Sequence, residues 1–569
     1  MKTYTSFLAS IAFMKRVMFL TLSIICANNL QAQNPSWSWA NGYGGADQDQ
    51  ARKSAVDPWG NIYTTGYFRS TSINFGSFNF ANPIAVDVMF LIKTSPSGNI
   101  IWAKSVVAND ETRGLAVTTD NIGNVFVVGD FSSSSIDFGS HQINNVNPPD
   151  WDNFIVKYDS AGNDLWARDI GGPLAELAYS VVCDDYNNVY FGGAYSSDSL
   201  HFANDVVYNF TPYDKELLLL KYSSNGSELW MRSSRGPLGS FATAIAIQGN
   251  RVYCTGYFEG TFMQVGPDTL WNSSSPNGTA EMYMTMYDTL GNQQWTRSFS
   301  GNGHEVPLGI DIDYSGFVCV SGFTSSSNFI LNQDTVYNPW LISVPFLARF
   351  NNAGDPAWVR YSTLSTTSGT ANSVAIGTLG DIIYTGYYID SISFQNQILT
   401  TGCSCVKMFV AAYDNAGNII WSKDAGGNQN STIGNGICIG SNSDLYVSGY
   451  FESDTAFFDG IQVVNTNPLQ QIFLAKIFDP FNSVNNVSTT SIVRVWPNPT
   501  NGIATIDIKD MDLKNVTVYN HLGEKVNAKV SGTASQINID LNSYSSGLYL
   551  VQCYCNDKFV TVKILLSKN

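Results

Sequence analysis

The sequence predicts an all-β protein that repeats one unit seven times, and two regularly spaced residues support this prediction. A tryptophan recurs at intervals of 63 to 65 residues, and a glycine in segments such as NIYTTGYF recurs at intervals of 63 to 66. A constant period of this length indicates a tandem array of supersecondary units. The tryptophans are Trp39, Trp102, Trp166, Trp230, Trp295, Trp358 and Trp421. The glycines are Gly66, Gly129, Gly193, Gly256, Gly322, Gly386 and Gly449.

Each unit is expected to contain four short strands. The first complete unit has four short runs of alternating or continuous apolar character, which are ARKSAVD, NIYTTGYF, MFLIKTS and NIIWAKSV. Turns at 57–61 and 95–99 join the first two and the last two runs. The turn at 57–61 and its counterparts at 120–124, 159–163, 288–292 and 414–418 start with Asp and carry Gly, as tight hairpins need, so we interpret these acidic turns as structural rather than as calcium loops.

The two markers are out of phase, and this predicts how the array closes. Trp39 precedes the first marker glycine, whereas no tryptophan follows Gly449 at the expected distance. We therefore expect the strand with Trp37 and Trp39 to complete the sheet that contains Gly449. Such a strand exchange closes a ring and removes free sheet edges, so the sequence predicts a seven-bladed β-propeller of four-stranded blades. The tryptophans are expected to pack between neighbouring sheets.

The chain is divided into four segments on these grounds. Residues 1–32 are predicted to be an export signal, because Lys15 and Arg16 precede an apolar run that ends near Ala32. Residues 33–481 form the expected propeller, 482–494 a polar linker, and 495–569 a small β-sandwich. Either Met1 or Met14 could be the initiator.

Composition restricts the possible partners and cofactors. The formal charge of −16 argues against a nucleic-acid partner. The apolar run of the signal is too short to span a bilayer, so no transmembrane segment is expected in the mature chain. Eight cysteines follow Cys26 without a spacing that defines their pairing. The four histidines do not lie at zinc-site spacing, and neither a metal nor a cofactor is expected.

The repeated unit resembles a known family. Its pattern combines GN-Y-x-x-G-x-F, then F-[IVL]-x-K, then GN-x-x-W, and the segments at 152–166 and 407–421 carry the last two parts best. This pattern is similar to the bacterial β-propeller repeat family found in exported proteins. The resemblance implies the architecture and does not imply an activity.

The C-terminal segment resembles a second family. PNPTNG, VYNHLGEKV, GLYLVQ and a terminal basic strand are similar to the type A sorting domain of the type IX secretion system of Bacteroidetes. The resemblance implies engagement with that machinery and transport through the periplasm to the outer-membrane surface or the medium. An immunoglobulin-like module without a targeting role is the alternative. The motif residues are Pro497, Asn498, Pro499, Asn501, Gly502, Gly523 and Gly547.

Function is expected on the face of the propeller opposite the DxxGN turns. That face receives connections of about 20 residues between the second and third strands, together with the links between units, and binding residues usually lie on such loops. Candidate ligand-binding residues in the links are Asp47, Asp49, Asp110, Glu111, Glu176, His304 and Glu305.

No catalytic set is recognised, because the sequence has no GxSxG elbow, HExxH pair or phosphate-binding loop. We therefore expect a binding or adhesion scaffold for a protein or a glycan, and no catalytic residue is assigned. The alternative is a carbohydrate-active enzyme, a glycoside hydrolase or lyase that uses scattered carboxylates.

Overall fold

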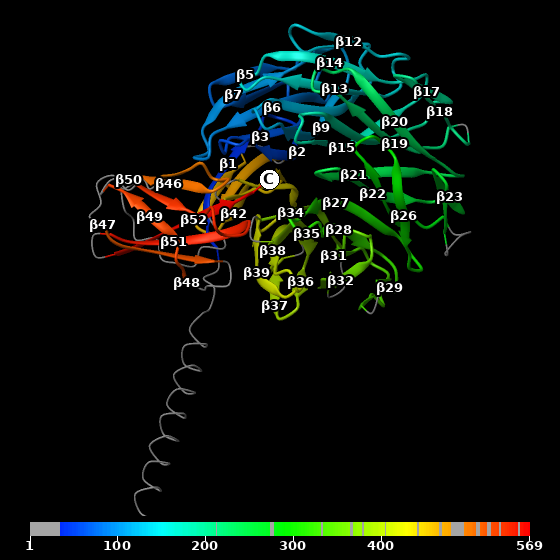
Figure 1. The fold of residues 1–569 in the computed structure, drawn as a ribbon. Coiled ribbons are helices and arrows are strands. Elements are labelled where there is room, and N and C mark those ends of the chain that lie inside the picture. The colour runs from blue at the N-terminus through cyan, green and yellow to red at the C-terminus, as the bar shows by residue number, and fades with distance from the viewer. Residues whose placement is uncertain are drawn as a thin grey trace, which may run out of the picture. The chain divides into compact units, whose positions relative to one another are not determined.

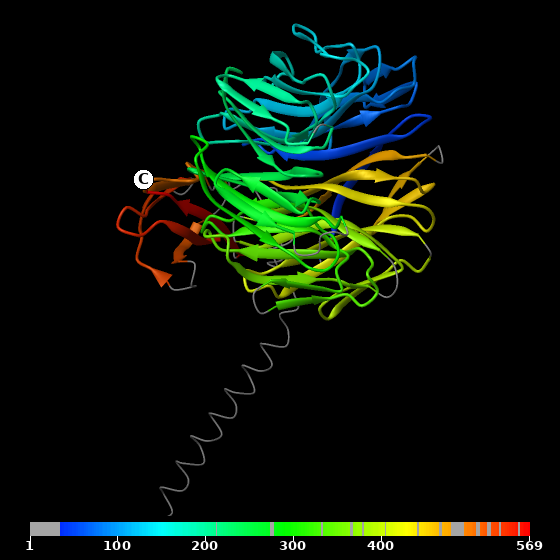
Figure 2. The ribbon, with the colours of Figure 1, turned by 90° about the vertical axis from the view of Figure 1, so that its right-hand side faces the viewer.

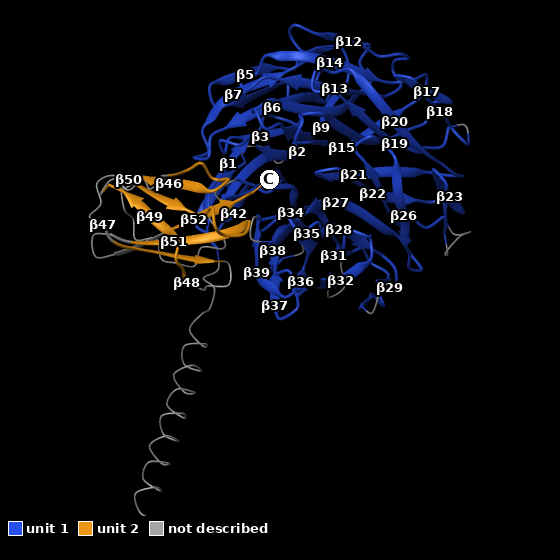
Figure 3. Ribbon diagram, in the orientation of Figure 1, with its two compact units in different colours: residues 1–481 blue, residues 482–569 orange. Residues whose placement is uncertain are grey.

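The protein was analysed as a computed structural model that divides into two compact units, residues 1–481 and 482–569 (Figure 3). The predicted export signal lies outside the described residues, as do residues 482–493 of the predicted linker. The described residues contain strands and no helix, which confirms the all-β prediction, and none of them forms a membrane-spanning helix. The structure describes residues 35–211, 213–272, 278–331, 334–364, 368–377, 380–403, 405–440, 443–465, 469–478, 494–507, 513–520, 525–533, 536–555 and 558–568.

Unit 1 contains seven sets of four antiparallel strands, which we number as sheets 1 to 7 along the chain. Sheet 3 is extended by β23 (Phe262–Val265) and β24 (Asp268–Trp271) to six strands. Sheets 1 to 3 are formed by β2 (Asp49–Val56), β3 (Ile62–Phe68), β6 (Val88–Thr94) and β7 (Ile100–Ser105); by β9 (Thr112–Thr119), β10 (Val125–Phe131), β13 (Asp152–Tyr158) and β14 (Asp164–Ile170); and by β15 (Glu176–Cys183), β16 (Val189–Tyr195), β19 (Glu216–Tyr222) and β20 (Glu228–Arg235). Sheets 4 and 5 are formed by β21 (Ser240–Gln248), β22 (Arg251–Phe258), β25 (Glu281–Asp288) and β26 (Gln293–Phe299); and by β27 (Glu305–Ile312), β28 (Val318–Thr324), β31 (Val344–Phe350) and β32 (Pro356–Tyr361). Sheets 6 and 7 are formed by β34 (Gly369–Ile376), β35 (Ile382–Ile389), β38 (Val406–Tyr413) and β39 (Ile419–Ala425); and by β40 (Thr432–Ile439), β41 (Leu445–Phe451), β44 (Gln471–Ile477) and β1 (Trp37–Tyr43).

The N-terminal strand completes the last sheet. β1 pairs antiparallel with β44, and β44 pairs with β41, which carries Gly449. The predicted pairing of the Trp37 and Trp39 strand is therefore confirmed, and Figure 2 shows the blue N-terminal strands beside the orange strands of sheet 7. The first strand of each sheet contacts the first strand of the next, and β40 of sheet 7 contacts β2 of sheet 1. Figure 1 shows these first strands toward the middle of unit 1.

The marker glycine is required by a β-bulge in the neighbouring first strand. In every sheet the register between the first and second strands shifts by one residue at this glycine or immediately beside it. A Cβ on Gly66 would lie 1.9 Å from the carbonyl oxygen of Gln50, and a Cβ on Gly256 would lie 1.7 Å from that of Phe241. No other residue fits this close backbone approach. The bulged residues are Arg52, Leu115, Tyr179, Thr243, Leu308, Asn372 and Asn435.

In sheets 1, 2, 3, 5 and 7, the repeated tryptophan and a basic residue link the sheet to the next one. In sheet 1, the Trp102 indole N–H and the Lys93 ammonium both donate to the carbonyl of Ser160, at 3.1 and 2.9 Å. Ser160 lies in the turn between the third and fourth strands of sheet 2. Trp39 in sheet 7 donates in the same way to Pro96 in sheet 1, at 3.2 Å. These tryptophans are buried between sheets, as predicted for Trp102, Trp166, Trp230, Trp358 and Trp421.

The basic residue also pairs with the Asp of its own first turn. The pairs are Lys93–Asp57, Lys157–Asp120, Lys221–Asp184, Arg349–Asp313 and Lys476–Asp444. Sheets 4 and 6 have Met286 and Ala412 at the basic position. In both sheets the Asp that starts the turn is also replaced, by Gln248 or Gly377. The ion pair is thus present or absent as a unit, because a buried charge without its partner is costly.

The connections between the second and third strands are more regular than predicted. Each folds largely into a short hairpin whose second strand contacts the outermost strand of the same sheet. Figure 1 shows these hairpins at the periphery of unit 1. The hairpin strands are β4 (Ser72–Phe75), β5 (Phe78–Ala81), β11 (Ser135–Asp137), β12 (Gln142–Asn144), β17 (Ser199–Phe202), β18 (Asp205–Tyr208), β23 (Phe262–Val265), β24 (Asp268–Trp271), β29 (Asn328–Leu331), β30 (Asp334–Tyr337), β36 (Ser391–Phe394), β37 (Gln397–Thr400), β42 (Thr455–Phe458) and β43 (Ile461–Val464). Two short strands after sheets 1 and 5, β8 (Val107–Ala108) and β33 (Thr363–Leu364), pair with β11 and β36.

Unit 2 contains two four-stranded sheets that share one hydrophobic core, an arrangement typical of a β-sandwich. One sheet is β45 (Arg494–Trp496), β46 (Ile503–Asp507), β50 (Gln536–Asp540) and β49 (Lys529–Gly532). The other is β48 (Lys525–Val526), β47 (Leu513–Asn520), β51 (Gly547–Cys555) and β52 (Lys558–Leu566).

Candidate functional site

Three of the predicted ligand-binding residues are buried and support their own loops. Asp49, Glu176 and Glu305 each occupy the first position of a first strand, and at most 1% of each is exposed. The Glu176 carboxylate accepts hydrogen bonds from the Gly172 N–H and from the Ser197 hydroxyl. This geometry corrects the expectation that these carboxylates are loop charges open to a ligand, and it favours a structural role.

Burial also changes the protonation of these carboxyl groups. Desolvation raises the pKa of Asp49 to about 6, that of Glu305 to about 7 and that of Glu176 to about 8, although hydrogen bonds to each carboxylate oppose the shift. The nearby Asp152 carboxylate also raises the pKa of Glu176. The links between sheets are therefore held by carboxyl groups that titrate near neutral pH.

The other predicted residues lie nearer the surface and are not brought together. Glu111 pairs with Arg69 and Arg113, both at 3.0 Å, and its side chain is 25% exposed. Asp110 accepts a hydrogen bond from the Glu111 N–H. These two acids lie between sheets 1 and 2.

Asp47 and His304 lie in separate links. The Asp47 N–H donates to the Ser70 hydroxyl at 2.8 Å, in the link before sheet 1. The His304 Nδ1 accepts the Ala280 N–H at 3.1 Å, in the link before sheet 5. Neither contact places these side chains beside Asp110 or Glu111.

We define the loop face as the side of unit 1 where the first strands begin, and the turn face as the side of the first and third turns. Near the loop face, five half-buried tyrosines lie on first and second strands of different sheets. We name this group the tyrosine cluster. Its members are Tyr67, Tyr179, Tyr257, Tyr387 and Tyr450.

Electrostatic coupling connects the members of the tyrosine cluster. The pKa of Tyr450 rises to about 12, mainly through desolvation, and Tyr67 and Tyr387 add to the shift. Tyr257 and Asp130 similarly act on the pKa of Tyr179. A phenol hydroxyl can both donate and accept hydrogen bonds. The sequence carried a signal for this group, because Tyr directly follows the marker glycine in four of the seven units.

Arg52 and Asp130 lie among these tyrosines. Arg52 lies in the bulge of β2, which pairs with the β3 strand of Tyr67 and contacts the β41 strand of Tyr450. Burial raises the pKa of Tyr67, Tyr450 and Asp130, and the positive charge of Arg52 opposes each rise. Asp130 is 5% exposed, and burial raises its pKa to about 7. Neither residue was recognised from the sequence, since the direction of a bulged side chain depends on strand register.

Lys53 lies next to Arg52 and connects three sheets. Its ammonium donates to the carbonyls of Asn372 at 2.8 Å and Asn435 at 3.0 Å, which belong to sheets 6 and 7. Desolvation lowers the pKa of Lys53 to about 7, and the charge of Arg52 acts in the same direction. These hydrogen bonds give Lys53 a structural role, whereas Arg52 has no such contact with the described residues.

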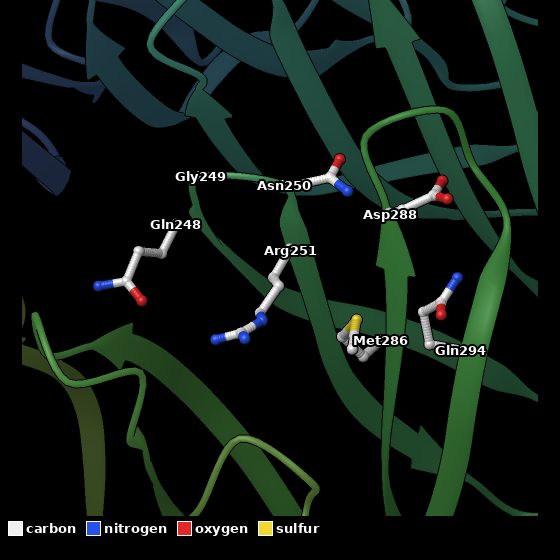
Figure 4. A pocket seen from close by; sticks show the side chains of 7 residues that line it. All are labelled: Gln248, Gly249, Asn250, Arg251, Met286, Asp288 and Gln294. Carbon is white, nitrogen blue, oxygen red and sulfur yellow. The ribbon is translucent and has the colours of Figure 1, made fainter. Parts of the chain in front are cut away.

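Two pockets lie on the turn face, opposite the predicted binding face. The first has a volume of about 520 Å³ and is open (Figure 4). It is lined by the turn of sheet 4 from Gln248 to Arg251, together with Met286, Asp288 and Gln294. Met286 occupies the position of the lysine that most other sheets use for their ion pair, so this pocket lies where the repeat is irregular.

The second pocket has a volume of about 390 Å³ and an acidic lining that includes Asp184, Asp185, Asp311 and Asp313. Asp184 and Asp313 already pair with Lys221 and Arg349. Among the residues that the structure describes, no group of three or more His, Cys, Asp or Glu side chains could hold a metal ion. Cys403 and Cys405, whose pairing the sequence left open, form a disulfide.

The C-terminal motif residues hold the ends of unit 2 together. Asn498 donates its amide to the Lys563 carbonyl and accepts the Leu565 N–H, at 3.0 and 2.7 Å. The Gly502 carbonyl accepts the Leu541 N–H. Pro497 and Pro499 precede and follow Asn498, Asn501 precedes Gly502, and Gly547 begins β51, whereas Gly523 lies outside the described residues.

Residues 494–567 match the family described as "Secretion system C-terminal sorting domain". This segment defines the chain as a protein exported by type IX secretion to the cell surface or the medium. The match covers unit 2 and does not extend to the repeats of unit 1.

The repeats are similar to a few proteins of known sequence. The "Uncharacterized WD repeat-containing protein L264" of Acanthamoeba polyphaga mimivirus is 24% identical over 456 residues, which cover 64% of this chain and 32% of that protein. The "Regulatory protein FlaEY" of Caulobacter vibrioides is 27% identical over 153 residues, which cover 26% of this chain and 16% of that protein. The chain thus spans about a third or less of these relatives.

Solved structures resemble the chain only distantly. A Dyadobacter fermentans protein of unknown function has a TM-score of 0.35 at 8% identity and covers 78% of this chain and 99% of its own. A Synechocystis apocarotenoid oxygenase variant has a TM-score of 0.32 at 9% identity, with 69% and 94% coverage.

Proposed function

We propose that unit 1 is a seven-bladed β-propeller that acts as a binding scaffold for a protein or a glycan outside the cell. Seven sheets whose first strands contact one another in a cycle support the architecture. The sorting domain supports the location. The bacterial β-propeller repeat family and a Bacteroidetes source remain part of this proposal.

The tyrosine cluster is the observation that carries the binding role. Tyrosines offer a large, rigid contact area that combines an apolar ring with a polar hydroxyl, and binding surfaces are enriched in them. Five half-buried tyrosines from five sheets would present such an area on one side of the ring. Asp110, Glu111, Asp47 and His304 remain candidate contacts around it.

The alternative is a carbohydrate-active enzyme, and Asp130 is the observation that favours it. A buried carboxyl group with a pKa of about 7 has the property that general acid–base catalysis requires. An enzyme of this kind uses two carboxyl groups on opposite sides of the scissile bond.

A glycan and protein-binding screen with the full mature chain tests this proposal. We expect at least one ligand whose binding is lost in a Tyr257→Ala, Tyr387→Ala, Tyr450→Ala variant. Tyr186→Ala is the matched control, because Tyr186 is 82% exposed in a turn between the first two strands of sheet 3. Ligand binding that survives the triple variant and depends on Arg251 instead would contradict the proposed face. Hydrolysis of a bound glycan that disappears in Asp130→Asn would support the enzyme.

A further inference from the structure

The bulge of each first strand places one residue at an equivalent position, and three polar members of this set form hydrogen bonds to the next sheet. The Thr243 hydroxyl donates to the Pro307 carbonyl of the next sheet at 2.7 Å. The amides of Asn372 and Asn435 donate to Gly434 and Ala51 of the following sheets, at 3.0 and 2.9 Å. Polar bulge residues thus satisfy a carbonyl of the neighbouring sheet.

Arg52 is the charged member of this set and lacks such a contact. Its guanidinium has neither a hydrogen bond nor an ion pair with any residue that the structure describes. Arg69 and Arg113, by contrast, are both held by Asp87 at 2.8 Å. A half-buried guanidinium with five donors and no acceptor is not explained by the fold.

Asp130 supplies a second, independent sign of an incomplete site. Its Oδ1 atom is buried and has no hydrogen-bond partner among the described residues. Buried carboxyl oxygens are normally satisfied, so this one calls for an explanation. Asp130 pairs in register with Arg113, whose guanidinium lies 5.6 Å from the Tyr67 ring. The charge of Arg52 also acts on Asp130, so the unsatisfied acceptor and the unsatisfied donor lie in the same cluster.

We propose that Arg52 binds the carboxylate of an acidic sugar, such as a uronic acid, whose ring stacks on the tyrosine cluster. This inference rests on the proposed binding function and specifies its ligand. The planar guanidinium matches a carboxylate through two parallel hydrogen bonds. Asp130 would bond a hydroxyl of the sugar, and the phenols of Tyr67 and Tyr450 would bond others.

The composition of the cluster favours an acidic sugar over an acidic peptide. Among the described residues, the cluster combines five phenol hydroxyls with one uncommitted cation, and this ratio suits a ligand with many hydroxyls and one charge per unit. The net charge of −16 repels any anionic ligand at long range, so binding would depend on the local contact with Arg52.

The protonation of Asp130 makes the proposed binding depend on pH. Arg52 and Arg113 lower the pKa of Asp130, Asp87 and Glu111 raise it, and burial dominates. Above pH 7 the ionised Asp130 would compete with the ligand for Arg52. Affinity for a uronate is therefore expected to fall several-fold between pH 6 and pH 8.

Isothermal titration calorimetry of the full mature chain with two chemically matched probes tests the proposal. The probes are an oligogalacturonate and the same oligomer with its carboxyl groups reduced to alcohols. We expect Arg52→Gln to weaken oligogalacturonate binding at least tenfold and Arg52→Lys to restore it only in part, without a change in melting temperature. Arg251→Gln, at an exposed arginine of the turn face, should leave binding unchanged.

The possible failures are distinguishable. Equal affinity of the wild-type chain for both probes, with loss in the tyrosine variant, would overturn the acidic-sugar inference and leave the binding scaffold in place. If an acidic peptide bound through Arg52 and neither oligomer bound, the inference of a sugar ligand would be wrong, and Arg52 would remain an anion-binding residue. No effect of the tyrosine and Arg52 variants on any ligand would overturn both proposals.

Discussion

The two faces of unit 1 are built in different ways from the same repeat. On the turn face, the same contacts recur: an Asp starts the turn, a basic residue pairs with it, and a tryptophan donates to the next sheet. On the loop face, equivalent positions hold different residues. The bulge position is Arg52 in sheet 1, Leu115 in sheet 2 and Tyr179 in sheet 3. The comparison indicates that repetition within the chain marks stability, and we propose that variation among units serves recognition.

The turn face also shows how the repeat tolerates exceptions. Sheet 4 lacks both members of the ion pair, and there the Trp295 indole N–H is buried without a partner among the described residues. The pocket of Figure 4 lies at this exception. A break in the repeated contacts therefore leaves a hollow, and this pocket needs no ligand to explain it.

Deletion of residues 33–45 should have the largest effect on stability. The deletion removes β1, the buried Trp37 and the hydrogen bond from Trp39 to Pro96, and it exposes the edge of β44. Loss of one buried tryptophan alone costs about 3 to 5 kcal/mol, so we expect the free energy of unfolding to fall by more than that. Thermal denaturation followed by circular dichroism measures the loss. A deletion variant that melts like the parent would refute the closure.

Lys157→Met should test the turn-face contacts, because it introduces the residue found in sheet 4. The substitution leaves the buried Asp120 carboxylate without its cation, which lies at 3.4 Å, and removes the hydrogen bond to Ser224. We expect a cost of about 3 kcal/mol in urea denaturation. Adding Asp120→Asn should recover part of this loss, as sheets 4 and 6 lack both charges. If the double variant were less stable than Lys157→Met alone, the joint absence of both charges from sheets 4 and 6 would have another cause.

Glu176→Gln should change the pH dependence of stability. The folded pKa of Glu176, about 8, lies above the ordinary value near 4.3, so the folded state retains a proton that the unfolded state loses. This contribution to stability is complete below pH 4 and is lost as pH rises to about 8. The stability of the variant relative to the parent should therefore rise by roughly 4 kcal/mol between pH 4.5 and pH 8. If the unfolding free energies of the variant and the parent changed in parallel between these pH values, the raised pKa of Glu176 would be contradicted.

Glu111→Ala and Asp110→Ala should have the smallest effects. Glu111 bonds two arginines at its partly exposed position, so its loss should cost about 1 kcal/mol. Asp110→Ala should stay within about 0.5 kcal/mol. Calorimetric melting of the two single variants measures each loss of stability, and equal losses would contradict a stabilising role of the Glu111 ion pairs with Arg69 and Arg113.

The period of the sequence predicted most of the fold, because tryptophan and glycine occupy positions that every unit needs. The strand exchange at Trp39 followed from the phase of the two markers. The role of Gly66 could not be predicted in this way, because the bulge that brings a carbonyl close to it is visible only in the pairing register. The hairpins such as β4–β5 were also missed, because short strands inside a connection give weak alternation.

The site was predicted less well than the fold. Acidic residues in the links were chosen by chain position, and burial could not be judged for Asp49, Glu176 and Glu305. A residue at the first position of a strand faces either solvent or its own loop, depending on register. Arg52 and Asp130 were overlooked because composition carries no information about a missing partner: Arg52 stands beside Lys53 in a largely polar strand, and Asp130 is the charged residue of an apolar one.

Hydrogen–deuterium exchange of the full mature chain, with and without oligogalacturonate, tests most directly whether recognition lies on the loop face. We expect ligand-dependent protection in peptides that cover β2 and β10, which carry Arg52 and Asp130, and none in peptides that cover residues 248–251 and 286–294. Protection confined to residues 248–251 and 286–294 would place recognition on the turn face and contradict the proposed loop-face site.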